Sequence, residues 1–299
     1  MTLRVALVTA REARGLDEDL PPLESAMGAA GVETRVVDWD DPAVEWQAFD
    51  VALLRSTWDY TDRLRDFLAW VESAASVTTL LNPPSVVRWN TDKHYLAQLG
   101  RAGVPVVPSS FIEPGESAQQ ALTAFLARHD APEFVVKPSV GAGSRDTQRH
   151  SRALIAPAAA QAERLLSAGR SVLLQPYLDS VDQEGETALI YFAGRFSHAI
   201  RKGALLPRGA TASPAIGLFV PEKITARTPG ADELGVADRV LGALPFPVPL
   251  YARVDVIRDA TGSPVLLELE LTEPSLFFAH SPAAAERFTA ALVQRIRGG

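Results

Sequence analysis

An acidic hairpin near the C-terminus constrains this chain more strongly than any other stretch. The segments Tyr251–Arg258 (YARVDVIR) and Pro264–Ser275 (PVLLELELTEPS) both have the composition of strands, and the turn-forming residues DATGS separate them. Side chains of a strand alternate between two faces, so Glu268 and Glu270 share one face of the second strand. Its other face is apolar and carries Val265, Leu267, Leu269 and Leu271.

The register of the hairpin decides what its polar face holds. A register that pairs position 258 with position 265 places Asp255 opposite Glu268, and Arg253 opposite Glu270. Carboxylates that face each other across strands repel, so a patch with Asp255, Glu268 and Glu270 calls for a cation. Hard oxygen donors without cysteine favour Mg²⁺. The alternative is a hairpin whose polar face is solvated, and the hairpin alone does not separate the two.

Composition limits the class of protein. Of the 299 residues, 47% are hydrophobic and 22% charged, which suits a soluble protein of two or three lobes. The net charge of −7 and the lack of a basic block argue against nucleic acid or an anionic membrane as a partner. The sequence has no cysteine, no signal-peptide core and no apolar run as long as a membrane span, so a cytoplasmic location is expected.

Short apolar runs alternate with helical segments in the first 80 residues and predict a parallel α/β lobe. Strands are expected at residues 3–9, 33–38 and 51–55, with helices at 23–30 and 61–75. Ligands of such sheets bind beyond the carboxyl ends of the strands. The segments there are suited to a small zwitterionic substrate and supply Arg11, Arg55, Ser56, Thr57, Asp59 and Tyr60. Alternatively, the second segment is a capped loop whose Trp58 fills the core.

Two lysines and a glycine-rich loop follow a linker at residues 81–84. A helix expected over Val87–Leu99 places Lys93 in its first turn, where a cation is unfavourable unless it has an anionic partner such as phosphate. The apolar strand Glu133–Pro138 contains Lys137 and runs directly into SVGAGS at 139–144. The loop predicts phosphate binding through its backbone N–H groups, although it is also compatible with a simple turn. It matches neither GxxxxGK[ST] nor GxGxxG, which argues against a P-loop kinase or a Rossmann dehydrogenase.

The remaining segments predict antiparallel strands with helices around them. Strands are expected at 171–178, 187–192 and 196–202, and helices at 232–244 and 283–297. Lys202 ends the third of these strands, where it is able to face phosphate. The acidic run at 179–186 either is a solvated loop or supplies a ribose ligand. The proline- and glycine-rich segment 203–223 is a candidate lid.

Taken in order, these pieces resemble the ATP-grasp ligases, most closely the glutathione-synthetase-like and RimK-like branch. The series is Lys93 in NTDK, Lys137 in FVVKP before the glycine-rich loop, QPYL at 175–178, Arg201-Lys202, Arg253-Val-Asp255 and Glu268-Leu-Glu270. The strings RSTWDY, NPPSVVRWNTDK, EGE and LELELTEPSLFF also resemble a narrower group, which includes the O-ureido-serine cyclo-ligase that makes D-cycloserine. The resemblance implies an α/β protein with the ATP-grasp fold, in which two α+β lobes clamp ATP. The N-terminal α/β lobe is expected at 1–88, the central lobe at 89–175 and the C-terminal lobe with the Mg²⁺ site at 176–299.

The resemblance also implies a role for each matching residue. The ATP phosphates are expected to contact Lys93, Lys137, Gly141, Gly143 and Ser144. The adenine pocket is expected to contain Gln175, Tyr177 and Leu178, and the ribose ligand is Glu184 or Glu186. The transferring phosphoryl group is expected to face the catalytic residues Lys202 and Arg253. One or two Mg²⁺ ions are assigned to Asp255, Glu268 and Glu270, and substrate contacts beyond them to Glu273 and Ser275.

One position departs from the pattern of the glutathione synthetases, which carry Asn two residues after the metal-binding Glu. Here that position is Glu270, so either the metal ligands are more anionic or the second metal site differs.

The implied chemistry activates a carboxylate as an acyl phosphate, which a nitrogen nucleophile then attacks. The nitrogen belongs either to the same molecule, as in the cyclo-ligase, or to a second substrate, as in an amide ligase. A third hypothesis is a non-catalytic ATP-binding module, against which the complete set of lysines and carboxylates argues. The expected partner is a small amino-acid-like substrate. A homodimer stays open, because many such ligases dimerise.

Overall fold

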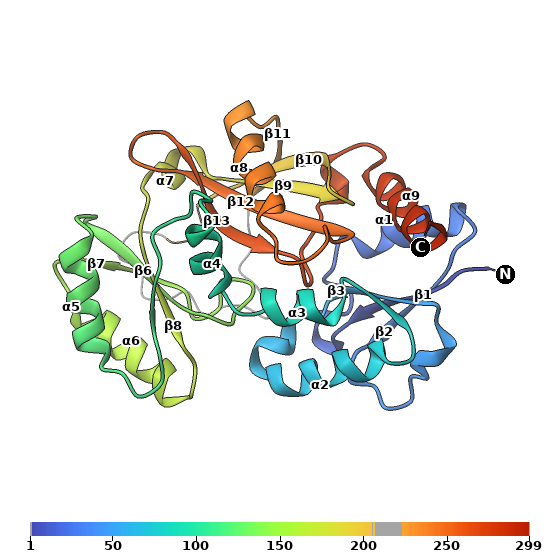
Figure 1. Cartoon of the computed structure of the whole chain (residues 1–299), viewed down its shortest axis with the longest axis horizontal. Helices are drawn as coiled ribbons and strands as arrows, with labels where there is room; N and C mark the ends of the chain where they lie inside the picture. The colour runs from blue at the N-terminus through green and yellow to red at the C-terminus, as the bar shows by residue number, and fades with distance from the viewer. Residues whose placement is uncertain (1, 205, 207–222, 299) are drawn as a thin grey trace.

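The computed structural model describes residues 2–204, 206 and 223–298, which form three sheets in succession along the chain (Figure 1). The expected lid at 203–223 lies almost wholly outside these residues. Within the described part, no helix has the length and apolarity needed to cross a membrane. The fold confirms the predicted mixture of a parallel α/β lobe with antiparallel α+β lobes.

The N-terminal sheet is parallel, as the strand–helix alternation predicts. Its order is β2-β1-β3-β4, and its strands are β1 (Arg4–Thr9), β2 (Glu33–Asp38), β3 (Val51–Ser56) and β4 (Thr79–Leu81). Its main helices are α1 (Leu20–Ala29) and α2 (Leu64–Ala75), and the short helices η1 (Arg11–Ala13), η2 (Trp46–Ala48) and η3 (Trp58–Asp62) complete it. Because β1 and β3 are buried on both faces, they read as continuous apolar runs rather than as alternating ones.

The central sheet is antiparallel and carries its helices on one face. Its order is β5-β8-β6-β7, with β5 (Ser110–Ile112), β6 (Glu133–Pro138), β7 (Gln148–Ser151) and β8 (Val172–Pro176). The helices α5 (Ala118–Arg128) and α6 (Ala156–Ser167) pack on Phe134 and Val136 of β6. Since side chains alternate along the strand, Lys137 points to the face that the helices leave uncovered.

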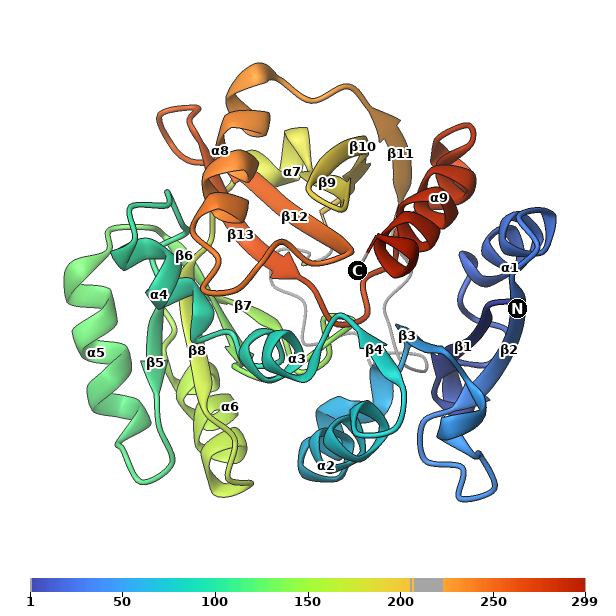
Figure 2. The ribbon, with the colours of Figure 1, turned by 45° about the vertical axis from the view of Figure 1, so that its right-hand side comes forward.

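The C-terminal sheet has the antiparallel order β11-β10-β9-β12-β13. Its strands are β9 (Glu186–Phe192), β10 (Arg195–Lys202), β11 (Ile224–Arg227), β12 (Tyr251–Arg258) and β13 (Pro264–Glu270). The helices of this part are α7 (Ser180–Glu184), α8 (Ala231–Gly242), η4 (Phe278–His280) and α9 (Ala284–Arg297). Helix α9 lies beside α1 of the N-terminal lobe (Figure 2), and both helices contribute to one apolar core with β1 and β9.

The single helix expected over Val87–Leu99 is wrong. The structure has two short helices, α3 (Pro84–Asn90) and α4 (Tyr95–Arg101), and Lys93 lies in the turn between them. The break has a physical reason, because the Asn90 side chain donates to the Leu269 carbonyl oxygen at 2.8 Å and accepts from the Leu271 N–H at 2.6 Å. Asn90 is therefore fixed to the end of β13, and the chain turns there.

Candidate active site

The three lobes surround one large cavity of about 570 Å³. One end is lined by β6, β8 and the glycine-rich loop, and the middle by β13 with the lysines. The other end is lined by residues 16–19 of the N-terminal lobe and by the segment after β13. The acidic hairpin of β12 and β13 thus forms the floor at the centre of the cavity.

The predicted cross-strand pairs of the hairpin are confirmed. Asp255 pairs with Glu268 and Arg253 pairs with Glu270. Three carboxyl groups and one guanidinium group therefore meet on one face of two neighbouring strands, as period-two alternation requires.

The pairing changes beyond this patch, because a β-bulge lies between Asp255 and Val256. Val256 pairs with Leu266, and position 258 pairs with 264 instead of the expected 265. The placement of Leu267 on the apolar face is wrong as a result. Leu267 lines the cavity, and the fully buried Leu266 takes its place in the core.

Two lysines, one from the turn after α3 and one from β6, lie close to Glu268. Lys93 Nζ lies 2.9 Å from a Glu268 carboxylate oxygen and donates to the Gly141 carbonyl oxygen at 2.7 Å. Lys137 Nζ lies 3.9 Å from the other carboxylate oxygen. Burial raises the pKa of Glu268, but the positive charges of Lys93 and Lys137 outweigh it and hold the pKa below its usual value. Burial lowers the pKa of Lys137, and the charge of Glu268 opposes that shift.

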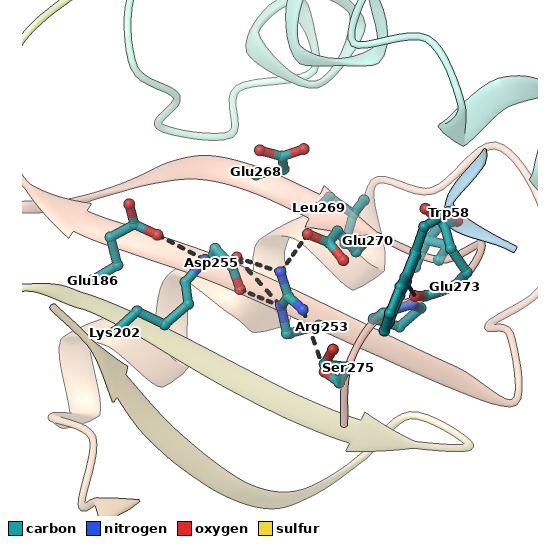
Figure 3. A network of polar contacts seen from close by, with 12 residues as sticks. Trp58, Glu186, Lys202, Arg253, Asp255, Glu268, Leu269, Glu270, Glu273 and Ser275 are labelled. Atoms are coloured by element: carbon teal, nitrogen blue, oxygen red, sulfur yellow. Dashed lines mark hydrogen bonds and ion pairs between the residues drawn. The ribbon is translucent and has the colours of Figure 1, made fainter. Parts of the chain in front are cut away.

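A second ion-pair network surrounds Asp255 (Figure 3). Lys202 Nζ lies 2.8 Å from both Asp255 and Glu186, and Arg253 Nε donates to Asp255 at 2.9 Å. Arg253 also forms an ion pair with Glu270. Burial raises the pKa of Asp255, but the charges of Arg253 and Lys202 outweigh it, so Asp255 stays ionised. Burial raises the pKa of Glu270 to about 7, against the opposing charge of Arg253.

The carboxylates of this network bind lysine and arginine side chains. Among the described residues, no three His, Asp or Glu side chains converge as a ready-made metal cage. The donor chemistry nevertheless suits Mg²⁺, since Asp255, Glu268 and Glu270 offer only oxygen.

The end of the cavity at the central sheet contains the residues predicted for the nucleotide. Gln175 Nε2 donates to Ser109 Oγ at 3.0 Å, and the Tyr177 hydroxyl donates to Asp182 at 2.5 Å. The guanidinium of Arg149 lies 3.5 Å from the centre of the Tyr177 ring, which fixes the ring from behind. The predicted residues that line this part are Lys137, Gly141, Gly143, Ser144, Gln175, Tyr177 and Leu178.

The two candidate ribose ligands lie in different surroundings. Glu186 lines the cavity, whereas Glu184 is exposed and lies 3.6 Å from Arg258. Only Glu186 is therefore placed to contact a ligand within the cavity.

The predicted substrate residues divide into two groups. Glu273 and Ser275 line the cavity, together with Trp58. Trp58 also packs against the core of the N-terminal lobe, as the alternative interpretation of its segment expects. The lining formed by the described residues does not include Arg11, Arg55, Ser56, Thr57, Asp59 or Tyr60. Arg11 is exposed, and Asp59 accepts a hydrogen bond from Trp39 Nε1 at 2.8 Å.

Arg55 is fully buried between the lobes. Its Nη2 lies 3.4 Å from Asp19 and 3.9 Å from Asp17, and it donates to the Pro274 carbonyl oxygen at 3.3 Å. Asp17 and Asp19 themselves line the cavity and were missed by sequence reasoning. The only signal for them is the acidic run DED directly after the first strand and its polar loop.

Comparisons with known proteins show which family the chain resembles. Residues 5–82 match the family described as the N-terminal domain of D-cycloserine synthetase DcsG. The cycloserine biosynthesis protein DcsG of Streptomyces lavendulae is 43% identical, over 98% of this chain and 99% of that protein.

Solved structures extend the similarity to the whole fold. The crystal structure of D-cycloserine synthetase DcsG is 42% identical, with a TM-score of 0.92 over 98% of this chain and 99% of that one. The ATP-grasp ligase PsnB, in complex with a minimal precursor, Mg and ADP, is 20% identical, with a TM-score of 0.62 over 98% of each chain. The chain belongs to the DcsG family, and its fold is that of the ATP-grasp ligases.

Proposed function

We propose that this protein is an ATP- and Mg²⁺-dependent ligase that closes O-ureido-D-serine into the five-membered ring of D-cycloserine. The observation that carries the proposal is the network of Lys93, Lys137, Lys202 and Arg253 with buried and half-buried carboxylates at the centre of the cavity. Fixed cations stabilise the charge that spreads over the oxygens of a transferring phosphoryl group. The near full-length similarity to a cycloserine biosynthesis protein supports the choice of substrate.

We assign the nucleotide to the end of the cavity at the central sheet. Apolar and aromatic side chains there suit a flat base, and backbone groups at the end of β8 suit its polar edge. The glycine-rich loop, with Lys93 bonded to its Gly141 carbonyl group, suits the phosphates. Glu186 is the preferred ribose ligand, because Glu184 is exposed outside the cavity. The residues assigned to adenine are Gln175, Tyr177 and Leu178.

Asp255, Glu268 and Glu270 are the residues that would hold Mg²⁺. Together with Glu186, these carboxylates balance the positive charges of the surrounding lysines and arginine. The described network therefore has no excess positive charge to neutralise the negative charge of a triphosphate. A divalent cation bound there would supply the missing positive charge and would polarise the phosphoryl group. The solved structure of PsnB, which shares the fold, holds Mg and ADP.

The side chains of this protein orient the reaction. Arg253 Nη1 donates to the Ser275 carbonyl oxygen at 3.3 Å, so Arg253 connects the phosphoryl region with the substrate end of the cavity. Lys202 and Arg253 hold the substrate carboxylate and the phosphoryl group together as the acyl phosphate forms. The ureido nitrogen next to the ether oxygen then attacks the acyl carbon, and phosphate leaves. Lobes spanning 1–88, 89–175 and 176–299 enclose the acyl phosphate against water.

The test is turnover of defined substrates. Incubation with O-ureido-D-serine, ATP and Mg²⁺ should release ADP, phosphate and D-cycloserine in equal amounts, and Lys202→Met should abolish all three. ADP release with a pair of amino acids, and not with O-ureido-D-serine, would identify an amide ligase instead. ATP binding without turnover of any substrate would identify a non-catalytic module.

A further inference from the structure

Glu273 differs from the other buried or half-buried carboxyl groups around the cavity. Each of the others has a lysine or arginine nitrogen nearby, the most distant at 3.9 Å, and they are Asp17, Asp19, Glu186, Asp255, Glu268 and Glu270. Glu273 is only 7% exposed and lines the cavity, yet the described residues give it no ion-pair partner. Burying a carboxylate without a neighbouring cation costs free energy, which indicates that the Glu273 side chain has a functional role.

Neighbours from the N-terminal lobe fix Glu273 at the substrate end. Trp58 Nε1 donates to the Glu273 carbonyl oxygen at 3.3 Å, and Trp58 lies beside Glu273 in Figure 3. The buried Tyr60 hydroxyl forms a hydrogen bond with the Glu273 carboxyl group. Glu273 therefore follows the assigned metal ligands in the chain and lies next to Trp58 in the cavity lining, where the reacting part of the substrate is expected.

The proton affinity of Glu273 is unusual for a carboxyl group. Burial raises its pKa to about 8, and the charge of Glu270 adds to this effect, while the hydrogen bond from Tyr60 and the more distant Lys93 and Arg253 oppose it. Tyr60 belongs to η3, Lys93 to the turn after α3, Arg253 to β12 and Glu270 to β13. A base whose pKa lies near the working pH transfers protons most efficiently.

We propose that Glu273 is the general base of the ring-closing step, an inference that rests on the function proposed above. The ureido nitrogen forms a bond to the acyl carbon, the bond from that carbon to the phosphate oxygen breaks, and the electron pair leaves with phosphate. The N–H proton passes to a Glu273 carboxylate oxygen. This nitrogen is conjugated with its carbamoyl group and is a weak nucleophile until it loses that proton. The carbamoyl group is still on the ring after this step, and its removal consumes water.

The experiment compares Glu273→Gln with the parent enzyme on two reactions of the same acyl phosphate. Ring closure of O-ureido-D-serine is one, and trapping by added hydroxylamine, measured as hydroxamate and ADP, is the other. Hydroxylamine attacks as the neutral amine and needs no enzyme base. We expect ring closure to fall by at least about 100-fold, with hydroxamate formation largely retained. Ring closure at the parent rate, or loss of both products, would overturn the assignment.

A second variant separates proton transfer from a structural role. Tyr60→Phe removes a hydrogen bond that lowers the pKa of Glu273, so the lower-pH limb of kcat/KM for ring closure should move to higher pH, while the hydroxamate reaction should keep its profile. A loss of rate without movement of that limb would count against the base. If the parent forms neither product from O-ureido-D-serine, the proposed function fails, and this role of Glu273 fails with it.

Discussion

The contact between the N-terminal lobe and the segment after β13 gives the sharpest test of the structure. It centres on Asp19, which is 4% exposed. The Asp19 carboxylate accepts hydrogen bonds from the backbone N–H groups of Leu276 at 2.5 Å, Phe277 at 3.1 Å and Phe278 at 2.8 Å. It also lies 3.4 Å from the guanidinium of Arg55. One side chain therefore satisfies three donors of a distant segment and a buried charge.

Asp19→Ala removes all four interactions and supplies no replacement acceptor. Each backbone donor left unsatisfied in the interior costs about 1 kcal/mol or more. Removing one partner of a buried ion pair costs about 3–5 kcal/mol. The cost of losing the ion pair with Arg55 should be smaller here, because Asp17 still lies 3.9 Å from Arg55. The free energy of unfolding should therefore fall by about 5 kcal/mol, which corresponds to a Tm lower by about 8 °C for a chain of this length.

Thermal unfolding followed by circular dichroism measures this change. Asp41→Ala is the matched control, because the Asp41 side chain accepts one exposed hydrogen bond, from Ala43 N–H at 2.9 Å, and should cost about 1 kcal/mol or less. Asp19→Asn keeps acceptor capacity but loses the charge, so its Tm should lie between the two. If Asp19→Ala and Asp41→Ala lowered Tm equally, the proposed contribution of the Asp19 interactions to the free energy of unfolding would be refuted.

Two further predictions concern the network and the response to acid. Glu268→Gln should lower ADP release by about 100-fold or more while ATP binding, followed by calorimetry, persists; unchanged turnover would contradict the metal assignment. Burial lowers the pKa of His198 to about 4. The unfolded chain therefore takes up a proton below about pH 6.5 that the folded protein refuses, so stability should fall between about pH 6.5 and 4. His198→Gln should remove up to about 3 kcal/mol of that fall in urea titrations; an identical slope would exclude His198 as its source.

The centre of the site could be predicted from the sequence because it depends on local alternation. Glu268 and Glu270 alternate onto one face of β13, Arg253 and Asp255 alternate onto one face of β12, and the pairing of the strands brings the two sets together. Lys137 faces away from residues that pack on helices. The β-bulge could not be predicted in this way. The extra residue in β13 does not change the alternation of apolar and charged residues around Leu267, so the sequence pattern does not indicate where the side chains change face.

The contribution of the N-terminal lobe to the substrate end escaped prediction because it depends on contacts between lobes. Trp58 and Arg55 make their contacts across 215 and 219 residues of sequence, to the carbonyl oxygens of Glu273 and Pro274. Polar residues at the ends of parallel strands indicate that a ligand or a partner is contacted there. They do not indicate which side chain points into the cavity and which one contacts the neighbouring lobe. Here Arg55 turns to the lobe and Trp58 to the cavity. Substitutions at the lobe contact should therefore act on the substrate end through the position of Glu273, without touching the nucleotide end.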